Sequence, residues 1–136
     1  MSDIFKNYPQ PDYYIPDNRR IYLPKDIITI MSGETTTHSF EVPLNLNTDV
    51  KDYKAIYHLG LKVVLEKPKS ECDVIYDEET KTSIMTWILT PSETMLFKDT
   101  LLDAQVQLKF ILNDDTILYS DIRPIVLEDS LDRGDM

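Results

Sequence analysis

Short segments in which apolar and polar residues alternate, separated by turn-forming residues, recur along most of this chain. The clearest segment is Leu102–Leu112, where Leu108, Phe110 and their apolar neighbours alternate with glutamines and a lysine. Successive side chains of a β-strand point to opposite faces of a sheet, so a period of two predicts a strand with one buried face. Asn113-Asp114-Asp115 then predicts a hairpin turn, and Thr116–Ile122 is predicted to return as the paired strand.

Similar patterns predict further strands upstream. Thr37–Leu46 alternates, but Pro43 lies inside it and cannot donate a hydrogen bond to a neighbouring strand, which predicts a sheet edge or a bulge. Tyr53–His58 and Leu61–Glu66 are predicted to form two strands with Gly60 between them. Shorter strands are predicted at residues 27–31, 72–76 and 125–127.

The segment Ser83–Leu89 has apolar residues on both of its faces. This pattern is typical of a central strand that is covered on both sides, or of one whose second face is open to a partner. Directly after it, Thr90-Pro91-Ser92-Glu93 predicts a helix start, because threonine can cap the helix, proline suits its first turn and Glu93 completes a capping box. The predicted helix spans two to three turns and carries Met95 and Leu96.

These elements together predict the fold class. Short strands at regular spacing, with turn residues between them, are typical of an antiparallel sandwich or barrel. We expect an all-β fold, mainly an antiparallel β-sandwich of the immunoglobulin-like or jelly-roll-like kind, with one short helix.

The 136 residues predict one domain with two extensions. Residues 1–24 contain four of the eight prolines, which fix φ and disfavour helix at the preceding residue, so this part is predicted to be an extended arm, neither helix nor sheet core. Residues 25–128 are predicted to form the β-sandwich domain. Residues 129–136 are predicted to form a polar, flexible C-terminal tail.

The arm is the candidate protein interface. Its residues Tyr8, Tyr13, Tyr14, Ile15 and Tyr22 are too apolar for a plain solvated tail. They pack either on their own domain or on a neighbouring subunit. Tyrosine gives a large contact area at low entropic cost, and proline leaves little ordering entropy to lose on docking, so the second alternative is physically reasonable.

The charge and cysteine content limit the partners and the compartment. The net charge is −10, and residues 1–33 contain four bases and four acids, so the whole excess lies on residues 34–136. An acidic body repels phosphate and anionic lipid, so we expect neither nucleic acid nor membrane as a partner. Cys72 is the single cysteine, which excludes an internal disulfide. With no secretory pattern at the start and no apolar run of ~20 residues, synthesis in a cytoplasm is expected.

No pattern in the sequence indicates catalysis. Three glycines build neither a glycine-rich phosphate loop nor a Gly-x-Ser-x-Gly elbow. Cys72 with His38 or His58 is a poor nucleophile pair, because nothing near the thiol in the sequence lowers its pKa, and these residues are too few and too scattered for zinc. Asp77-Glu78-Glu79 and Asp114-Asp115 lack calcium-loop spacing and are predicted to be solvated turns. We therefore expect no enzyme activity, no metal and no cofactor.

One region carries a family resemblance. The shared elements are the strand Leu61–Glu66, a paired strand before Asp77, the strand ending at Leu89-Thr90, the short helix after it, and the hairpin Val106–Leu112/Thr116–Ser120. In this order they resemble the N-terminal domain of phage baseplate upper proteins, over Leu61–Leu127. That family has a glycine after the helix and another in the hairpin turn, where this chain has Asp103 and Asp115.

The resemblance implies a β-sandwich adaptor in a bacteriophage virion. Its partners would be other virion proteins and copies of itself, in the tail, baseplate, neck or head surface, with assembly in the host bacterial cytoplasm. Two other functions stay open. The domain could be a carbohydrate-binding module with a row of exposed aromatic rings, or a small acidic protein that inhibits a host factor by mimicking nucleic acid.

Overall fold

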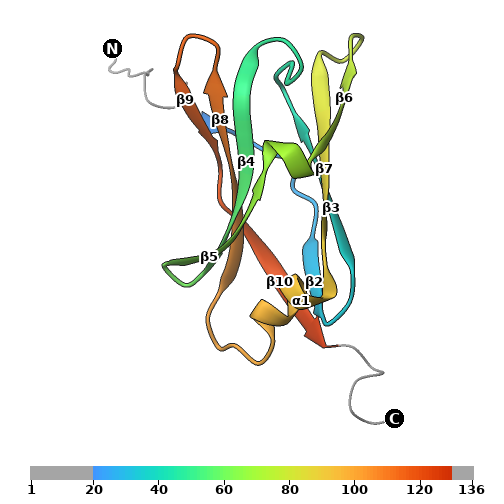
Figure 1. Cartoon of the computed structure of the whole chain (residues 1–136), viewed down its shortest axis with the longest axis vertical. Helices are drawn as coiled ribbons and strands as arrows, with labels where there is room; N and C mark the ends of the chain where they lie inside the picture. Colours follow the sequence, from blue (N-terminus) through green and yellow to red (C-terminus); the bar gives the residue numbers. More distant parts are fainter. Residues whose placement is uncertain (1–19, 130–136) are drawn as a thin grey trace, which may run out of the picture.

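The computed structural model describes residues 20–129, which form two β-sheets packed face to face (Figure 1). The seven-stranded sheet contains β1 (Arg20–Ile21), β2 (Ile28–Ser32), β4 (Val50–Leu59), β5 (Lys62–Pro68), β8 (Ala104–Leu112), β9 (Ile117–Ser120) and β10 (Arg123–Asp129). The three-stranded sheet contains β3 (Thr36–Val42), β6 (Asp73–Asp77) and β7 (Thr82–Leu89). The predicted all-β, sandwich-like fold with one short α-helix is confirmed.

Strand β8 is the centre of the larger sheet. It pairs along its length with β4, and β4 pairs in turn with the edge strand β5. The other side of β8 pairs with β10 near Ala104–Val106 and with β9 near Lys109–Ile111. Strand β1 then runs parallel to β9, and β2 runs parallel to β10. The edge of the sheet is therefore shared by β1 and β2, which are joined by residues 22–27, called the strap below.

Strand β7 is the centre of the smaller sheet, between β3 and β6. Its Met85, Trp87 and Leu89 side chains are buried in the core, whereas Ile84 and Ile88 are exposed on the outer face. Of the two alternatives for this strand, the open outer face is correct for the described residues. Apolar residues on both faces of a strand do not by themselves decide this, because a two-layer sandwich covers one face only.

The strand predicted at Thr37–Leu46 is shorter than expected. The observed strand β3 ends at Val42, directly before Pro43, and Phe40 and Val42 point inward as the alternation predicts, together with the polar His38. Proline stops the ladder because it has no N–H to donate. Strand β3 is an edge strand, so the expectation of an edge is confirmed.

The helical segment has the predicted cap, and only its first part is α-helical. Helix α1 spans Pro91–Thr94, and the 3₁₀ turn η3 (Met95–Phe97) completes it. The Thr90 side chain accepts a hydrogen bond from the Glu93 N–H, and the Glu93 carboxylate accepts one from the Thr90 N–H, which is a complete capping box. With four and three residues, the two elements make about two helical turns together, the lower end of the two to three turns that the sequence predicts. A left-handed residue soon after the helix, Asp99 with φ of +56°, turns the chain toward β8.

Within residues 20–129, no helix has the length and apolar character that a membrane-spanning helix needs.

Candidate interaction surfaces

The predicted arm residues are divided by the limit of the described chain. Tyr8, Tyr13, Tyr14 and Ile15 lie outside the described residues. Tyr22 lies inside them, and 60% of its surface is exposed. The structure therefore brings none of the four earlier residues into a described site, and it leaves Tyr22 available for contact.

The end of the predicted arm, residues 20–24, is part of the body. Arg20–Ile21 form β1, and the side chains of Ile21 and Leu23 are buried in the core. The Leu23 N–H donates to the Asp121 carboxylate at 2.9 Å, and the Asp121 N–H donates to the Ile21 carbonyl at 2.8 Å. The end of the predicted extended arm thus includes a two-residue edge strand, and Ile21 and Leu23, two residues apart, both have buried side chains.

Arg123 holds the strap against the body. Its guanidinium is buried and donates to the carbonyls of Leu23, Pro24 and Asp26. These three carbonyls lie between β1 and β2, outside the strand-to-strand hydrogen bonds of the described sheet. Arg123 therefore satisfies the backbone of the strap, which explains how a chain rich in proline can lie flat on an edge.

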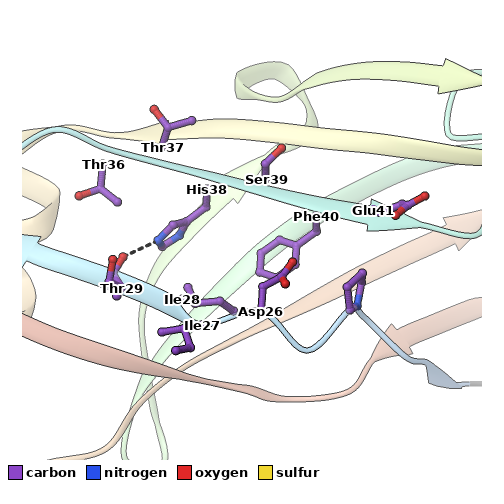
Figure 2. Close-up of a pocket in the computed structure, with 11 residues that line it drawn as sticks. Asp26, Ile27, Ile28, Thr29, Thr36, Thr37, His38, Ser39, Phe40 and Glu41 are labelled. Carbon is purple, nitrogen blue, oxygen red and sulfur yellow. Dashed lines mark hydrogen bonds between the residues drawn. The ribbon is translucent and has the colours of Figure 1, made fainter.

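A groove lies between the strap with β2 on one side and β3 on the other. Its volume is about 300 Å³, and Figure 2 shows the side chains that line it. The lining residues are Pro24, Asp26, Ile27, Ile28, Thr29, Thr36, Thr37, His38, Ser39, Phe40 and Glu41. Since β2 and β3 are each the edge of their sheet, the groove is the open side of the sandwich (Figure 1).

The groove is closed on its inner side by a hydrogen-bonded chain of buried side chains. His38 Nδ1 lies 2.5 Å from the Tyr57 hydroxyl, and the indole N–H of Trp87 donates to the same hydroxyl oxygen at 2.7 Å. His38 Nε2 lies 2.8 Å from the Thr29 carbonyl oxygen on β2 (Figure 2). A carbonyl only accepts, so Nε2 carries the proton and Nδ1 accepts from Tyr57.

Burial decides the charge states of His38 and Tyr57. It lowers the pKa of His38, although the hydrogen bond to the Thr29 carbonyl opposes this. It raises the pKa of the Tyr57 hydroxyl well above its ordinary value. Both groups are therefore neutral at pH 7, and each hydrogen bond has one donor and one acceptor. This arrangement holds the two sheets together and leaves no free general base.

The free edges of the sandwich are not equally protected. Edge strand β5 carries Lys67, whose buried ammonium group contacts Glu71 at 2.8 Å and Glu93 at 2.9 Å. Edge strand β6 begins and ends with the exposed acids Asp73 and Asp77. Charged residues on an edge, including inward-pointing ones, discourage the addition of another strand.

Strand β3 lacks this protection over most of its length. From Thr36 to Phe40 the sequence is Thr-Thr-His-Ser-Phe, without lysine, arginine, aspartate or glutamate. Within the described residues β3 pairs with β7 alone. The open edge of β3 is therefore a suitable site on the described body for an added strand, and it lies opposite the uncharged edge strand β2.

One end of the sandwich is apolar. Leu61, in the turn between β4 and β5, and Leu101, in the loop before β8, are fully exposed. The two loops are joined where the Gly60 N–H donates to the Asp103 carbonyl at 2.8 Å, and Leu102 lies beside Gly60. Other exposed apolar side chains of the same loop and helix are Met95, Leu96 and Leu102. We call Leu61, Met95, Leu96, Leu101 and Leu102 the apolar end.

The opposite end of the sandwich is acidic. The β6–β7 turn contains Glu78 and Glu79, and the β8–β9 turn contains Asp114 and Asp115; both turns lie at the upper end in Figure 1. Lys51 pairs with Asp115 there. Hydrogen bonding by Thr116 lowers the pKa of the exposed Asp114 carboxyl, which favours its charged form. The domain therefore has two chemically different ends.

The single cysteine is not activated. Burial, followed by the nearby Glu71 charge, raises the pKa of the Cys72 thiol to about 11, and its sulfur lies 3.4 Å from the Pro68 carbonyl oxygen. A thiol of this kind is protonated at neutral pH and is a weak nucleophile. Among residues 20–129, no group of three or more histidine, cysteine, aspartate or glutamate side chains is arranged to hold a metal ion.

Sequence reasoning named Tyr22, which is exposed, and named neither the groove nor the apolar end. Two signals were present in the sequence. A run of uncharged residues in a strand next to an internal proline indicates an edge that is open to pairing. The second signal is leucine beside a turn glycine or in a loop, as at Leu61 and Leu101. Such a leucine is not on the inward face of a strand, so its side chain is not buried by the sheet.

Comparison with known proteins adds no relative. No protein-family model matches the chain, and no curated protein sequence matches it.

Proposed function

We propose that this protein is a non-enzymatic structural adaptor of a bacteriophage virion, which assembles with other virion proteins and with copies of itself. The single observation that carries the assembly role is the apolar end, where Leu61 and Leu101 are fully exposed on two loops joined by a backbone hydrogen bond. Contiguous exposed apolar side chains are typical of protein–protein contact sites. The virion assignment rests on the resemblance of Leu61–Leu127 to the baseplate upper protein domain.

In this proposal the apolar end binds another virion protein, and the N-terminal arm binds a neighbouring copy. The strap supports the proposal that the arm binds a neighbouring copy. Arg123 and Asp121 hold the strap on the body as far as Ile21, so residues 1–19 are attached to a fixed point of the body. Burial of Tyr13, Tyr14 and Ile15 on the neighbour would stabilise the contact.

The test is incorporation into particles. Cells that carry the genome encoding this chain are allowed to assemble particles, which are purified on a density gradient and analysed by mass spectrometry. We expect the chain in the particle fraction, and we expect the double variant Leu61→Ser, Leu101→Ser to be depleted from it at least tenfold. The matched control is Ile117→Ser, an exposed apolar residue on β9 away from the apolar end. A wild-type chain found only in the soluble fraction would refute the virion role.

The arm is tested separately by deletion of residues 2–18. This deletion keeps β1 and the strap intact. We expect light scattering to show a smaller assembly than for the full chain, and an unchanged mass would exclude the arm from assembly.

The two other functions receive less support. A carbohydrate-binding module needs a row of aromatic rings on one sheet face, whereas the exposed aromatic side chains of the described residues are Tyr22 and Tyr119, which are two rings and not a row. Mimicry of nucleic acid would use the acidic end, where the acids belong to separate turns. A steep loss of partner binding with added salt would favour this last function.

A further inference from the structure

The groove beside β3 has features of a site that accepts an extended peptide. Its wall is the outer edge of β3, which pairs with no other strand of residues 20–129 and has no fixed charge between Thr36 and Phe40. An extended segment that adds to such an edge gains backbone hydrogen bonds along its length and side-chain contacts on alternate positions. The edges at β5 and β6 carry Lys67, Asp73 and Asp77, which discourage the addition of a strand, and the uncharged edge strand β2 lines the same groove as β3.

We propose that this groove binds residues 9–15 of the N-terminal arm of a second copy of the chain, as a strand added to β3. This inference rests on the proposed function, in which the arm binds a neighbouring copy, and names the surface that receives it. The argument combines the chemistry of the groove, the sequence of the arm and the direction in which the chain leaves the body.

The arm sequence suits strand addition on one side only. In an extended segment, successive N–H groups point to alternate sides. Pro9 and Pro11 lack an N–H and lie on the same side, so the N–H groups of Gln10, Asp12 and Tyr14 all point to the other side and remain free to pair. One side of this strand is therefore fully competent for pairing, and Pro16 ends it.

The two faces of the same segment also differ. Pro9, Pro11, Tyr13 and Ile15 share one face, and Gln10, Asp12 and Tyr14 share the other. An added strand would place the apolar face over the groove, next to Phe40 and Ile28, and the polar face toward solvent. This is the same division of faces that β3 has, with His38 and Phe40 inward and Thr37 and Ser39 outward (Figure 2).

The direction of β1 favours a second copy over the chain's own groove. Strand β1 runs parallel to β9, which begins just after the β8–β9 turn, so the chain enters β1 from that end of the sandwich. The groove lies further along the chain, beside the strap and β2. Binding to its own groove would require the arm to reverse its direction, whereas binding to a neighbour requires no reversal. Five residues, 16 to 20, would span roughly 16 Å when fully extended.

The experiment is disulfide trapping in the full chain, with Cys72→Ser as background. One protein carries Tyr14→Cys or Asp12→Cys on the polar face of the arm, and a second, of different mass, carries Ser39→Cys or Thr37→Cys on the outer face of β3. We expect oxidation of a mixture to give a cross-linked dimer that contains one of each. The control Ile84→Cys is also exposed on the outer face but lies on the central strand β7, and we expect at least tenfold less product from it.

Each outcome decides the inference. A dimer from an arm–β3 pair that exceeds the control supports it. Equal product from the control, or none from any arm–β3 pair, overturns it. A double variant that links within one chain at low concentration, with no product between chains, also overturns it and assigns the groove to the chain's own arm.

The deletion separates this inference from the proposed function. If trapping fails while deletion of residues 2–18 still reduces the assembly, the arm binds elsewhere and the proposed function stands. If the full chain does not assemble, the proposed function itself fails.

Discussion

The hydroxyl of Tyr57 lies 2.5 Å from Nδ1 of His38, and this contact joins β4 of the larger sheet to β3 of the smaller sheet. Tyr57 also accepts from Trp87 on β7, and His38 also donates to Thr29 on β2. Four strands from both sheets are thus joined by three hydrogen bonds inside the core. Buried polar groups are costly when they lose a partner, so the whole chain of bonds depends on the tyrosine hydroxyl.

Replacement of Tyr57 by phenylalanine should destabilise the domain by about 1–3 kcal/mol, because it leaves the Trp87 N–H and His38 Nδ1 without a partner. The measurement is urea denaturation followed by circular dichroism. Tyr119→Phe, at a half-exposed ring on β9, is the control and should change the free energy of unfolding by less than about 0.5 kcal/mol. Equal losses of unfolding free energy in both variants would contradict a stabilising role of the hydrogen bonds of Tyr57.

The stability of the domain should fall below pH 6.5 because of His38. Burial lowers the pKa of His38 in the folded state, so the unfolded chain, whose histidine titrates at about 6.5, binds the proton more readily. Protonation therefore favours unfolding, and stability is lost as the pH falls from about 6.5 toward the lower pKa of the folded state. Denaturation between pH 7.5 and 5 should show this decline in wild type and in His58→Gln. A decline of the same size in His38→Gln would contradict the assignment.

Lys67 should contribute more than an ordinary surface lysine. Burial lowers the pKa of its ammonium group, yet hydrogen bonds with Glu71 and Glu93 raise it above the ordinary value, so the charge is held in a buried place. Lys67→Met keeps the apolar stem and removes these bonds, and we expect a loss of about 1–3 kcal/mol in chemical denaturation. The control Lys54→Met, which breaks a half-exposed pair with Glu66, should cost at most about 1 kcal/mol.

Truncation should distinguish the arm from the strap. Deletion of residues 2–18 should leave the thermal unfolding temperature of the body nearly unchanged, because β1, Leu23 and the contacts of Arg123 remain. Deletion through Pro24 removes the buried Leu23 and two acceptors of Arg123, and it should cost roughly 3 kcal/mol or more. Similar unfolding temperatures for the two deletions would show that the strap does not belong to the body.

Glycine should be tolerated without loss of stability at positions 99 and 115 and should be destabilising at position 103. Asp99 and Asp115 have φ of +56° and +72°, a region that glycine adopts without strain. Asp99→Gly should therefore leave stability unchanged or raise it by less than about 1 kcal/mol, whereas Asp103→Gly should lower it by a similar amount because Asp103 has ordinary backbone angles. Thermal denaturation gives the comparison, and a gain at Asp103 would contradict it.

The same two positions show what the sequence could predict. Asp115 in the hairpin turn has a left-handed backbone, whereas after the helix the left-handed residue is Asp99 and not Asp103. The strands and the capping box were predicted well, because alternation and capping depend on neighbours in the sequence. The end of the helix depends on how Phe97 and Thr94 pack under the β2–β3 turn, where the Gly33 N–H donates to Thr94, and no local pattern encodes that contact.

The candidate surfaces were harder to predict for a related reason. Tyr22 could be chosen from its residue type alone. The groove requires knowledge that β2 and β3 belong to different sheets and meet at the open side, and a strand sequence does not say which sheet it joins. The apolar end requires the pairing of Gly60 with Asp103, forty-three positions apart in the sequence. Long-range pairings of this kind are fixed by the packed core and not by a local motif.

Trp87 is the only tryptophan of the chain, and it lies in the core with its indole bonded to a residue of the opposite sheet. Its fluorescence therefore comes from one known place, the layer where the two sheets meet. Any event that separates the sheets would expose the indole to water and shift its emission to longer wavelength, with no label added. The emission wavelength of Trp87 therefore reports whether the binding of a partner moves the two sheets apart or keeps them packed together.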